Sequence, residues 1–138
     1  MQTFLPHPNF AVTATMLDRA RLGKQRVEAK QIYLALTEGG WWKNHPAVQM
    51  WRGYESGLAE YGWWICSEWI ARGYRDSLAS LFDVRRDWIP RLPDWIGDEA
   101  FHASHRSNLL RKNPLWYSQF GWKESPFLPY VWPKGAAA

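Results

Sequence analysis

The sequence predicts an all-α fold, a single compact domain of about three main helices with an irregular, aromatic-rich C-terminal tail. Apolar residues recur at helical spacing in three long segments, and the alternating pattern of a β-strand is absent. A length of 138 residues suits one domain with a hydrophobic core of its own. We assign residues 1–133 to this domain and expect residues 134–138 to be disordered.

The chain begins with an arm and a long helix. Residues 1–12 contain two prolines and an asparagine, which indicates extended backbone. Thr13 or Thr15 can cap a helix that runs to about Glu38, where two consecutive glycines end it. The arm should therefore lead directly into the first helix.

The second long helix is expected to begin at Pro46, because proline suits the first turn, and to end at Gly73. Gly53 and Gly57 lie one turn apart within it, so we expect another backbone to approach closely there. A short helix should follow over residues 77–83.

The third long helix fits Asp98 to Lys112 and ends before Pro114, because the residue preceding a proline disfavours the helical conformation. Three further prolines break up the remaining chain. We expect this tail to wrap around the helices.

The composition is consistent with a protein that binds a polyanionic partner. The net charge is +4 and the isoelectric point is about 9.4. Eleven tryptophans are too many for the core alone, so some should line a groove or an interface. The single cysteine, Cys66, excludes an internal disulfide framework. No targeting pattern and no membrane-spanning window is present, so we expect a cytoplasmic protein.

A polar cluster on the first helix is the strongest candidate for chemistry. At 100° per residue, five side chains fall within an arc of roughly 120°; they are Arg21, Lys24, Gln25, Glu28 and Gln31. One interpretation is a solvated face with a Lys24–Glu28 pair one turn apart. The other is a carboxylate in a cationic pocket, suited to proton transfer on a phosphate-bearing substrate.

The third helix offers two further interpretations. Asp98, His102 and His105 share one face and could ligate a metal; the favoured alternative is a histidine pair that faces solvent or DNA. The second concerns cations beside aromatic rings, a combination that suits nucleic acid because cations hold phosphates and rings accept base faces; the residues are Arg106, Arg111, Lys112, Trp116 and Tyr117. The alternative is that the aromatic residues only dock the tail.

Two other residues have simpler interpretations. His45 precedes the second helix and is either its cap or a catalytic group. Cys66 lies among tryptophans and should be a buried small residue, not a nucleophile. No nucleotide-binding glycine loop, nucleophile elbow or cysteine cluster is present, so we expect no cofactor and no bound metal.

Three stretches resemble the pyrimidine-dimer DNA glycosylases of the endonuclease V type. The segment "NPLWYSQFG" is similar to the C-terminal signature of that family, Pro-x-Trp-Tyr-x-x-aromatic-Gly, from Pro114 to Gly121. The segment "EAKQIYLAL", beginning at Glu28, is similar to the first-helix pattern, and "EWIARGY", residues 68–74, to the end of the second helix.

The resemblance implies a compact three-helix DNA-repair enzyme without a cofactor. Such an enzyme kinks duplex DNA, displaces a base and cleaves the glycosidic bond through an N-terminal amine that forms a Schiff base. Glu28 occupies the position of the assisting glutamate, and the chain's N-terminal residue is Met1. The expected partner is double-stranded DNA with a damaged or modified base, bound by a monomer.

The sequence also departs from the family pattern. Val27 and Gln31 stand where the family has arginines, although Arg21, Lys24 and Arg26 lie close by and are expected to contact DNA. Since a bulky glutamine follows Met1, the methionine should be retained. Either the Met1 amine acts, a lysine replaces it, or the abasic-site lyase step is lost.

The leading hypothesis is a DNA glycosylase, with pyrimidine dimers as the default substrate. One alternative is a non-catalytic DNA-binding module of the same fold. Another is a metal-dependent nuclease that uses the histidine face of the third helix.

Overall fold

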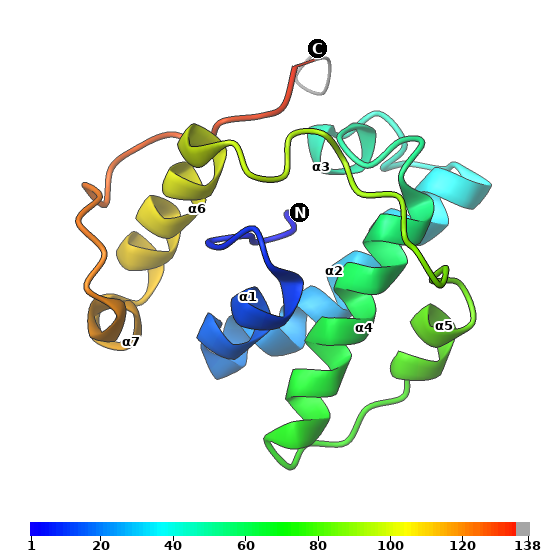
Figure 1. Cartoon of the computed structure of the whole chain (residues 1–138), viewed down its shortest axis with the longest axis horizontal. Coiled ribbons are helices and arrows are strands. Elements are labelled where there is room, and N and C mark those ends of the chain that lie inside the picture. The colour runs from blue at the N-terminus through cyan, green and yellow to red at the C-terminus, as the bar shows by residue number, and fades with distance from the viewer. Residues whose placement is uncertain (135–138) are drawn as a thin grey trace.

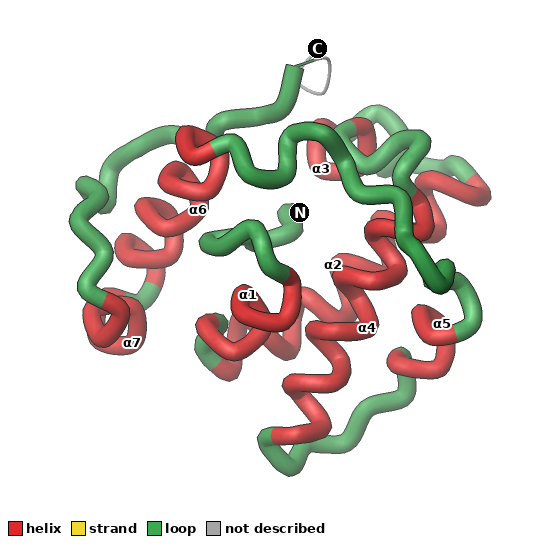
Figure 2. Tube along the Cα trace, viewed as in Figure 1, coloured by secondary structure: helices red, strands yellow, loops and turns green. Residues whose placement is uncertain are grey.

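A computed structural model describes residues 1–134 and confirms the all-α class. The described chain contains seven α-helices and one 3₁₀ turn, without a strand (Figures 1 and 2). The elements are α1 (Phe10–Met16), α2 (Arg19–Glu38), α3 (Pro46–Gln49), α4 (Glu55–Ala71), α5 (Ala79–Asp83), α6 (Glu99–Lys112), α7 (Pro114–Tyr117) and the 3₁₀ turn Ser118–Phe120. The three longest helices, α2, α4 and α6, correspond to the three main helices expected.

The first long helix is divided in two, which corrects the prediction of one helix from about residue 13 to 38. Asn9 caps α1 by accepting a hydrogen bond from the Val12 amide, so neither predicted threonine is the cap. The chain then leaves the helix at Leu17 and Asp18, which have extended backbones with ψ of 138° and 162°. The Asp18 amide donates to the hydroxyl of Tyr117, 99 residues away. A contact remote in sequence therefore stabilises this corner.

The second long helix is also divided, into α3 and α4. Gly53 interrupts it with φ of 85°, a left-handed conformation that side chains rarely adopt. The predicted close approach is wrong for Gly53, because a Cβ there would meet nothing within 4 Å. It is confirmed for Gly57, where a Cβ would lie 2.5 Å from the carbonyl oxygen of Arg91. This contact seats the α5–α6 loop on α4.

The rest of the chain follows the expected order. α5 lies within the predicted short helix, and Asp98 caps α6 by accepting a hydrogen bond from the Ala100 amide. The tail includes the short helix α7 and then runs along α6 (Figure 1). Ser104 and Asn108 of α6 hold it through bonds to the Val131 amide and the Leu128 carbonyl. Of the predicted disordered segment, residues 135–138 lie outside the described part of the chain.

The N-terminal arm ends at Asn9, earlier than expected, and lies in the interior (Figure 1). Both backbone groups of the buried Leu5 bind histidines of α6: its amide donates to Nδ1 of His105 at 2.9 Å, and its carbonyl accepts from Nδ1 of His102 at 2.7 Å. On the other side, Thr3 accepts a hydrogen bond from the indole of Trp51. The arm thus joins α6 to the α2–α4 layer and brings the chain's first residue to α2.

Among the described residues, no helix has both the length and the apolar character needed to cross a bilayer.

Candidate active site

A cleft of about 330 Å³ opens between the arm, the first half of α2 and the end of α6. Its lining combines the N-terminus, one carboxylate and three cations; the residues are Met1, Gln2, Phe4, Ala20, Arg21, Lys24, Glu28, Lys112 and Tyr130. Three residues of the polar arc predicted on the first helix, Arg21, Lys24 and Glu28, therefore line a cleft. The interpretation as a freely solvated surface is wrong for Glu28.

Glu28 is held in place within this cleft. It is 9% exposed, and its Oε2 accepts hydrogen bonds from the Gln2 amide at 3.2 Å and from Nε2 of Gln25 at 2.9 Å. Its Oε1 lies 3.7 Å from Nζ of Lys24, whose side chain is largely exposed. Oε2 therefore accepts both hydrogen bonds from the protein, while Oε1 lies nearest to the exposed amine of Lys24.

Gln25 orders the site, although the sequence offered no reason to separate it from its neighbours on the helix. Its Oε1 accepts from the Phe4 amide at 3.0 Å and from the Tyr61 hydroxyl at 2.7 Å. Its Nε2 donates to the Gln2 carbonyl at 2.8 Å and to Glu28. The amide thereby fixes the arm and the carboxylate relative to each other.

The three residues predicted as catalytic, Met1, Glu28 and His45, lie near one another. The Gln2 amide touches Glu28, and the Met1 nitrogen is at most three bond lengths, about 4.3 Å, from that amide. Burial lowers the pKa of His45, the positive N-terminus lowers it further, and the charge of Glu28 opposes both. His45 also caps α3, since its Nδ1 accepts from the Ala47 amide.

The cations of the cleft are not equivalent. Arg21 is paired with Asp18 at 3.0 Å, while Lys112 has no carboxylate partner within 4 Å in the described chain. Burial lowers the pKa of Lys112, and the positive charges of Arg21 and Arg111 lower it further. The amine of Lys112 thus loses its proton more readily than an ordinary lysine.

A second hollow, of about 650 Å³, adjoins the first and shares Ala20 and Lys24 with it. Arg26 lies here, paired with Asp76 at 2.6 Å and 5.0 Å above the ring of Trp69. Trp116 forms another part of the lining, with its indole bonded to the Met16 carbonyl. The two hollows together are lined by five cations, two carboxylates and several aromatic rings, so the surface is basic.

Three of the predicted DNA contacts are corrected by burial. His105 and Tyr117 have no exposed surface. The Tyr117 hydroxyl donates to Oδ1 of Asp18 at 2.5 Å and accepts from the Asp18 amide, so the residue docks the tail. Arg106 binds Glu99 and Glu124 and the Pro6 carbonyl, with its side chain only 13% exposed. These side chains hold the fold together and are not available to phosphates.

Arg111 and Lys112 remain at the surface, as predicted. The guanidinium of Arg111 is partly engaged, because it donates to the Pro126 carbonyl at 2.9 Å and to the amide oxygen of Asn108.

The predicted metal face of α6 is occupied by structural hydrogen bonds. Asp98 caps the helix, and the two ring nitrogens of His102 bind the Leu5 carbonyl and the Gly97 amide. Nδ1 of His105 accepts from the Leu5 amide, and its Nε2 is buried among aromatic rings with no hydrogen-bond partner among residues 1–134. Burial lowers the pKa of His105 to about 3. The candidate metal ligands of this face thus make hydrogen bonds that hold the arm and the start of α6. The interpretation as a metal-dependent nuclease does not fit them.

Cys66 is buried on α4, as predicted, and burial together with the nearby Asp76 carboxylate raises its pKa to about 12. Its thiol therefore stays protonated at neutral pH and is not a nucleophile.

Comparisons with known proteins give one match. The sequence model of the family described as pyrimidine dimer DNA glycosylase matches residues 1–80, more than half of the chain. The match includes the arm, Glu28 and His45, and ends before the segment 114–121. No curated protein and no solved structure matches. The chain belongs to the pyrimidine dimer DNA glycosylase family.

Proposed function

We propose that the protein is a DNA N-glycosylase that excises pyrimidine dimers from duplex DNA through the amine of Met1. The observation that carries this proposal is the position of the N-terminus beside Glu28 in one cleft with a cationic rim. An amine nucleophile and a carboxylate are the groups that imine chemistry requires. The cationic rim suits the phosphates on either side of a damaged base.

The reaction starts with a neutral amine that attacks C1′ of the damaged nucleotide. The C1′–N1 bond breaks, and its electron pair leaves with the base, which takes up a proton from solvent. The base is thereby released from its sugar but stays joined to the other pyrimidine of the dimer. The nitrogen then loses a proton, the C1′–O4′ bond opens, and O4′ takes up a proton, which leaves a protonated imine. We assign to Glu28 the role of accepting the proton from nitrogen and returning it to O4′, because its carboxylate accepts a hydrogen bond from the amide next to Met1. Strand cleavage by elimination would follow from this imine.

Two lysines of the cleft are rival nucleophiles. Nζ of Lys24 lies 3.7 Å from Glu28, and the pKa of Lys112 is lowered by burial and by neighbouring cations. Arginine substitutions distinguish them from Met1, because a guanidinium keeps the positive charge but forms no imine. Lys24→Arg and Lys112→Arg should therefore preserve base release if the N-terminal amine is the nucleophile.

The decisive experiment uses ultraviolet-irradiated and unirradiated duplexes with borohydride. We expect abasic sites and a borohydride-trapped protein–DNA adduct with the irradiated duplex alone. Acetylation of the Met1 amine should abolish the adduct. An adduct that persists after acetylation and disappears in Lys112→Arg would assign the reaction to Lys112. Binding of irradiated DNA without base release would instead indicate a non-catalytic DNA-binding module.

The DNA-binding role of the surface has its own test. Of the cations predicted to meet phosphates, Lys24 and Lys112 line the cleft with exposed side chains, whereas Arg106 is engaged inside the protein. Affinity should fall steeply with salt, and alanine at Lys24 or Lys112 should flatten that slope by about one counterion. We propose that the protein acts in this way as a monomer in the cytoplasm.

A further inference from the structure

The loop between α2 and α3, residues 39–45, exposes two consecutive tryptophans. Trp41 is 100% exposed and Trp42 is 49% exposed. A tryptophan side chain carries about 150–250 Å² of mostly apolar surface, so exposing one completely forgoes a large hydrophobic gain. Exposed aromatic surface of this size generally marks a place where something binds.

The loop is held in a defined shape. Gly39 and Gly40 have φ of 79° and 104°, conformations that favour glycine. The Lys43 amide donates to the Gly40 carbonyl, and the Lys43 carbonyl accepts from Gln49 at 2.6 Å and from Arg52 at 3.3 Å. The tryptophans are thus presented on an anchored turn, which reduces the entropy lost on binding.

A row of aromatic rings connects this loop to the cleft. The Trp42 ring lies 5.8 Å from that of His45, and His45 lies 6.3 Å from Trp132. Trp132 lies 6.0 Å from Tyr130, which lines the cleft with Met1 and Glu28. Trp42, with Trp41 next to it in the sequence, therefore lies at one end of a row of rings whose other end, Tyr130, lines the cleft.

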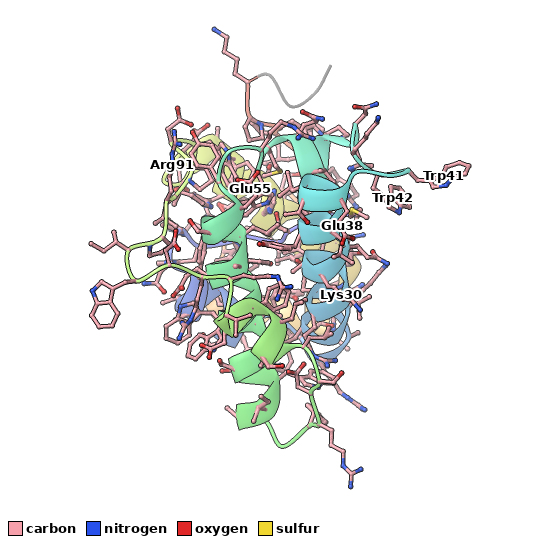
Figure 3. The ribbon with its side chains drawn as sticks, turned by 90° about the vertical axis from the view of Figure 1, so that its right-hand side faces the viewer. Lys30, Glu38, Trp41, Trp42, Glu55 and Arg91 are labelled. Carbon is pink, nitrogen blue, oxygen red and sulfur yellow. The ribbon has the colours of Figure 1, made fainter. Side chains whose placement is uncertain are left out.

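Figure 3 shows the direction of the loop. Trp41 and Trp42 project beyond the side of the molecule formed by α2, where Lys30 and Glu38 also lie, while Glu55 and Arg91 lie on the opposite side. The link from this side of the molecule to the cleft is the row of rings from Trp42 to Tyr130.

We propose that Trp41 and Trp42 form a wedge that stacks on DNA bases next to the lesion and holds the duplex open while the damaged nucleotide is in the cleft. This inference rests on the proposed function. We assign a base step to this surface because indole rings match base faces and because Lys43, beside them in the sequence, suits a phosphate. The row of rings from Trp42 to the cleft is the third reason. Apolar wedges of this kind stabilise unstacked and kinked DNA.

The chain contains a matched control. Trp88, in the loop between α5 and α6, is 99% exposed, but it lines a hollow with Glu60, Asp83, Arg86 and Asp87. Arg86 pairs with Glu60 and Asp83, so the hollow has an excess of negative charge, which disfavours DNA. Trp88→Ala removes a side chain as exposed as that of Trp41, so it measures the effect of losing an exposed tryptophan outside the proposed wedge.

The test uses duplexes that carry one pyrimidine dimer with 2-aminopurine, a base whose fluorescence rises on unstacking, beside it. The parent protein should raise the fluorescence on binding. Trp41→Ala/Trp42→Ala should lose that rise and bind the damaged duplex more weakly, by about 5- to 150-fold for each stacked base lost. Trp88→Ala should match the parent. The salt slope should be the same in all three proteins, because no phosphate contact is removed.

A second substrate separates a wedge from a merely structural role. When the nucleotides opposite the dimer are abasic, the stack is already disrupted, and the double variant should regain most of the parent's rate of base release. Phenylalanine at both positions should restore fluorescence and binding on the ordinary duplex.

The outcomes for the two proposals differ. A parent that binds and cleaves irradiated DNA, together with a double alanine variant that does so equally well and raises the fluorescence equally, would overturn the wedge alone. A parent without preference for irradiated DNA would overturn the proposed function and the wedge with it. A double variant whose defect persists on the abasic-opposed substrate would also overturn the wedge.

Discussion

Replacing Gln25 by methionine should damage the fold and the site together. Methionine has a similar length and leaves no cavity, but it can neither donate nor accept the four hydrogen bonds that the amide makes. The Tyr61 hydroxyl keeps a partner in the Phe4 carbonyl, and Glu28 keeps the Gln2 amide. The Phe4 amide and the Gln2 carbonyl lose the hydrogen bonds that they make with Gln25.

The expected loss of stability follows from those two groups. Each buried polar group left without a partner costs about 1–3 kcal/mol, so Gln25→Met should lower the free energy of unfolding by about 2–6 kcal/mol. Natural domains have only about 5–15 kcal/mol in total. For a chain of 138 residues, this corresponds to a fall in Tm of roughly 7–20 °C.

The functional loss should be larger than the loss of folded protein. With the amide gone, the arm is no longer tied to α2 beside Glu28, so the amine and the carboxylate lose their mutual position. At a temperature where the variant is fully folded, single-turnover base release should fall while affinity for irradiated duplex stays close to that of the parent.

Gln31→Met is the matched control, because Gln31 is an exposed glutamine on the same helix with no side-chain hydrogen bond in the described chain. It should melt and react like the parent. If Gln25→Met has the same Tm as Gln31→Met in calorimetry and releases base at the same rate, the hydrogen-bond network does not position the site.

Three further predictions concern single side chains. Glu28→Gln should fold and bind DNA normally, because an amide oxygen can accept the same two hydrogen bonds, but base release should fall by about 10²–10⁴-fold; normal turnover would remove Glu28 from the mechanism. Tyr117→Phe should lower the free energy of unfolding by about 1–3 kcal/mol in urea titrations, since it deprives the buried Asp18 of a donor and an acceptor, while an unchanged stability would contradict the docking role. Because the pKa of His105 is about 3 when folded and ordinary when unfolded, the unfolded chain binds more protons between pH 3 and about 6.5, and stability should fall as the pH falls through that window. His105→Asn keeps an acceptor for the Leu5 amide but does not titrate, so its stability should depend less steeply on pH; equal slopes would show that this histidine is not responsible.

The features that depend on neighbours in sequence could be predicted. Helical spacing of apolar residues and the stop at Pro114 both act within one or two turns, and α6 ends where the proline indicated. The same regularity brought Glu28 and Lys24 onto one face of a helix before any tertiary contact was known.

The features that depend on residues distant in the sequence could not be predicted. The corner at Asp18 is stabilised by a hydroxyl 99 residues away, and the break at Gly53 comes with the seating of Trp51 against the arm. Propensity within a single segment contains no information about such contacts, so both helices were expected to be continuous.

Burial was decided by the tertiary structure alone. Tyr117 and His105 have the residue types of a DNA-binding surface, yet the tail and the arm enclose them, whereas Trp41 has the residue type of a core and is completely exposed. A side chain's type sets what it gains from burial or from an exposed partner, but whether it is covered depends on segments that reach it only when the chain is folded. The sequence by itself therefore determined the helical class and the carboxylate on α2, and the arm threaded between α6 and α2 decided which of the other candidates can meet a substrate.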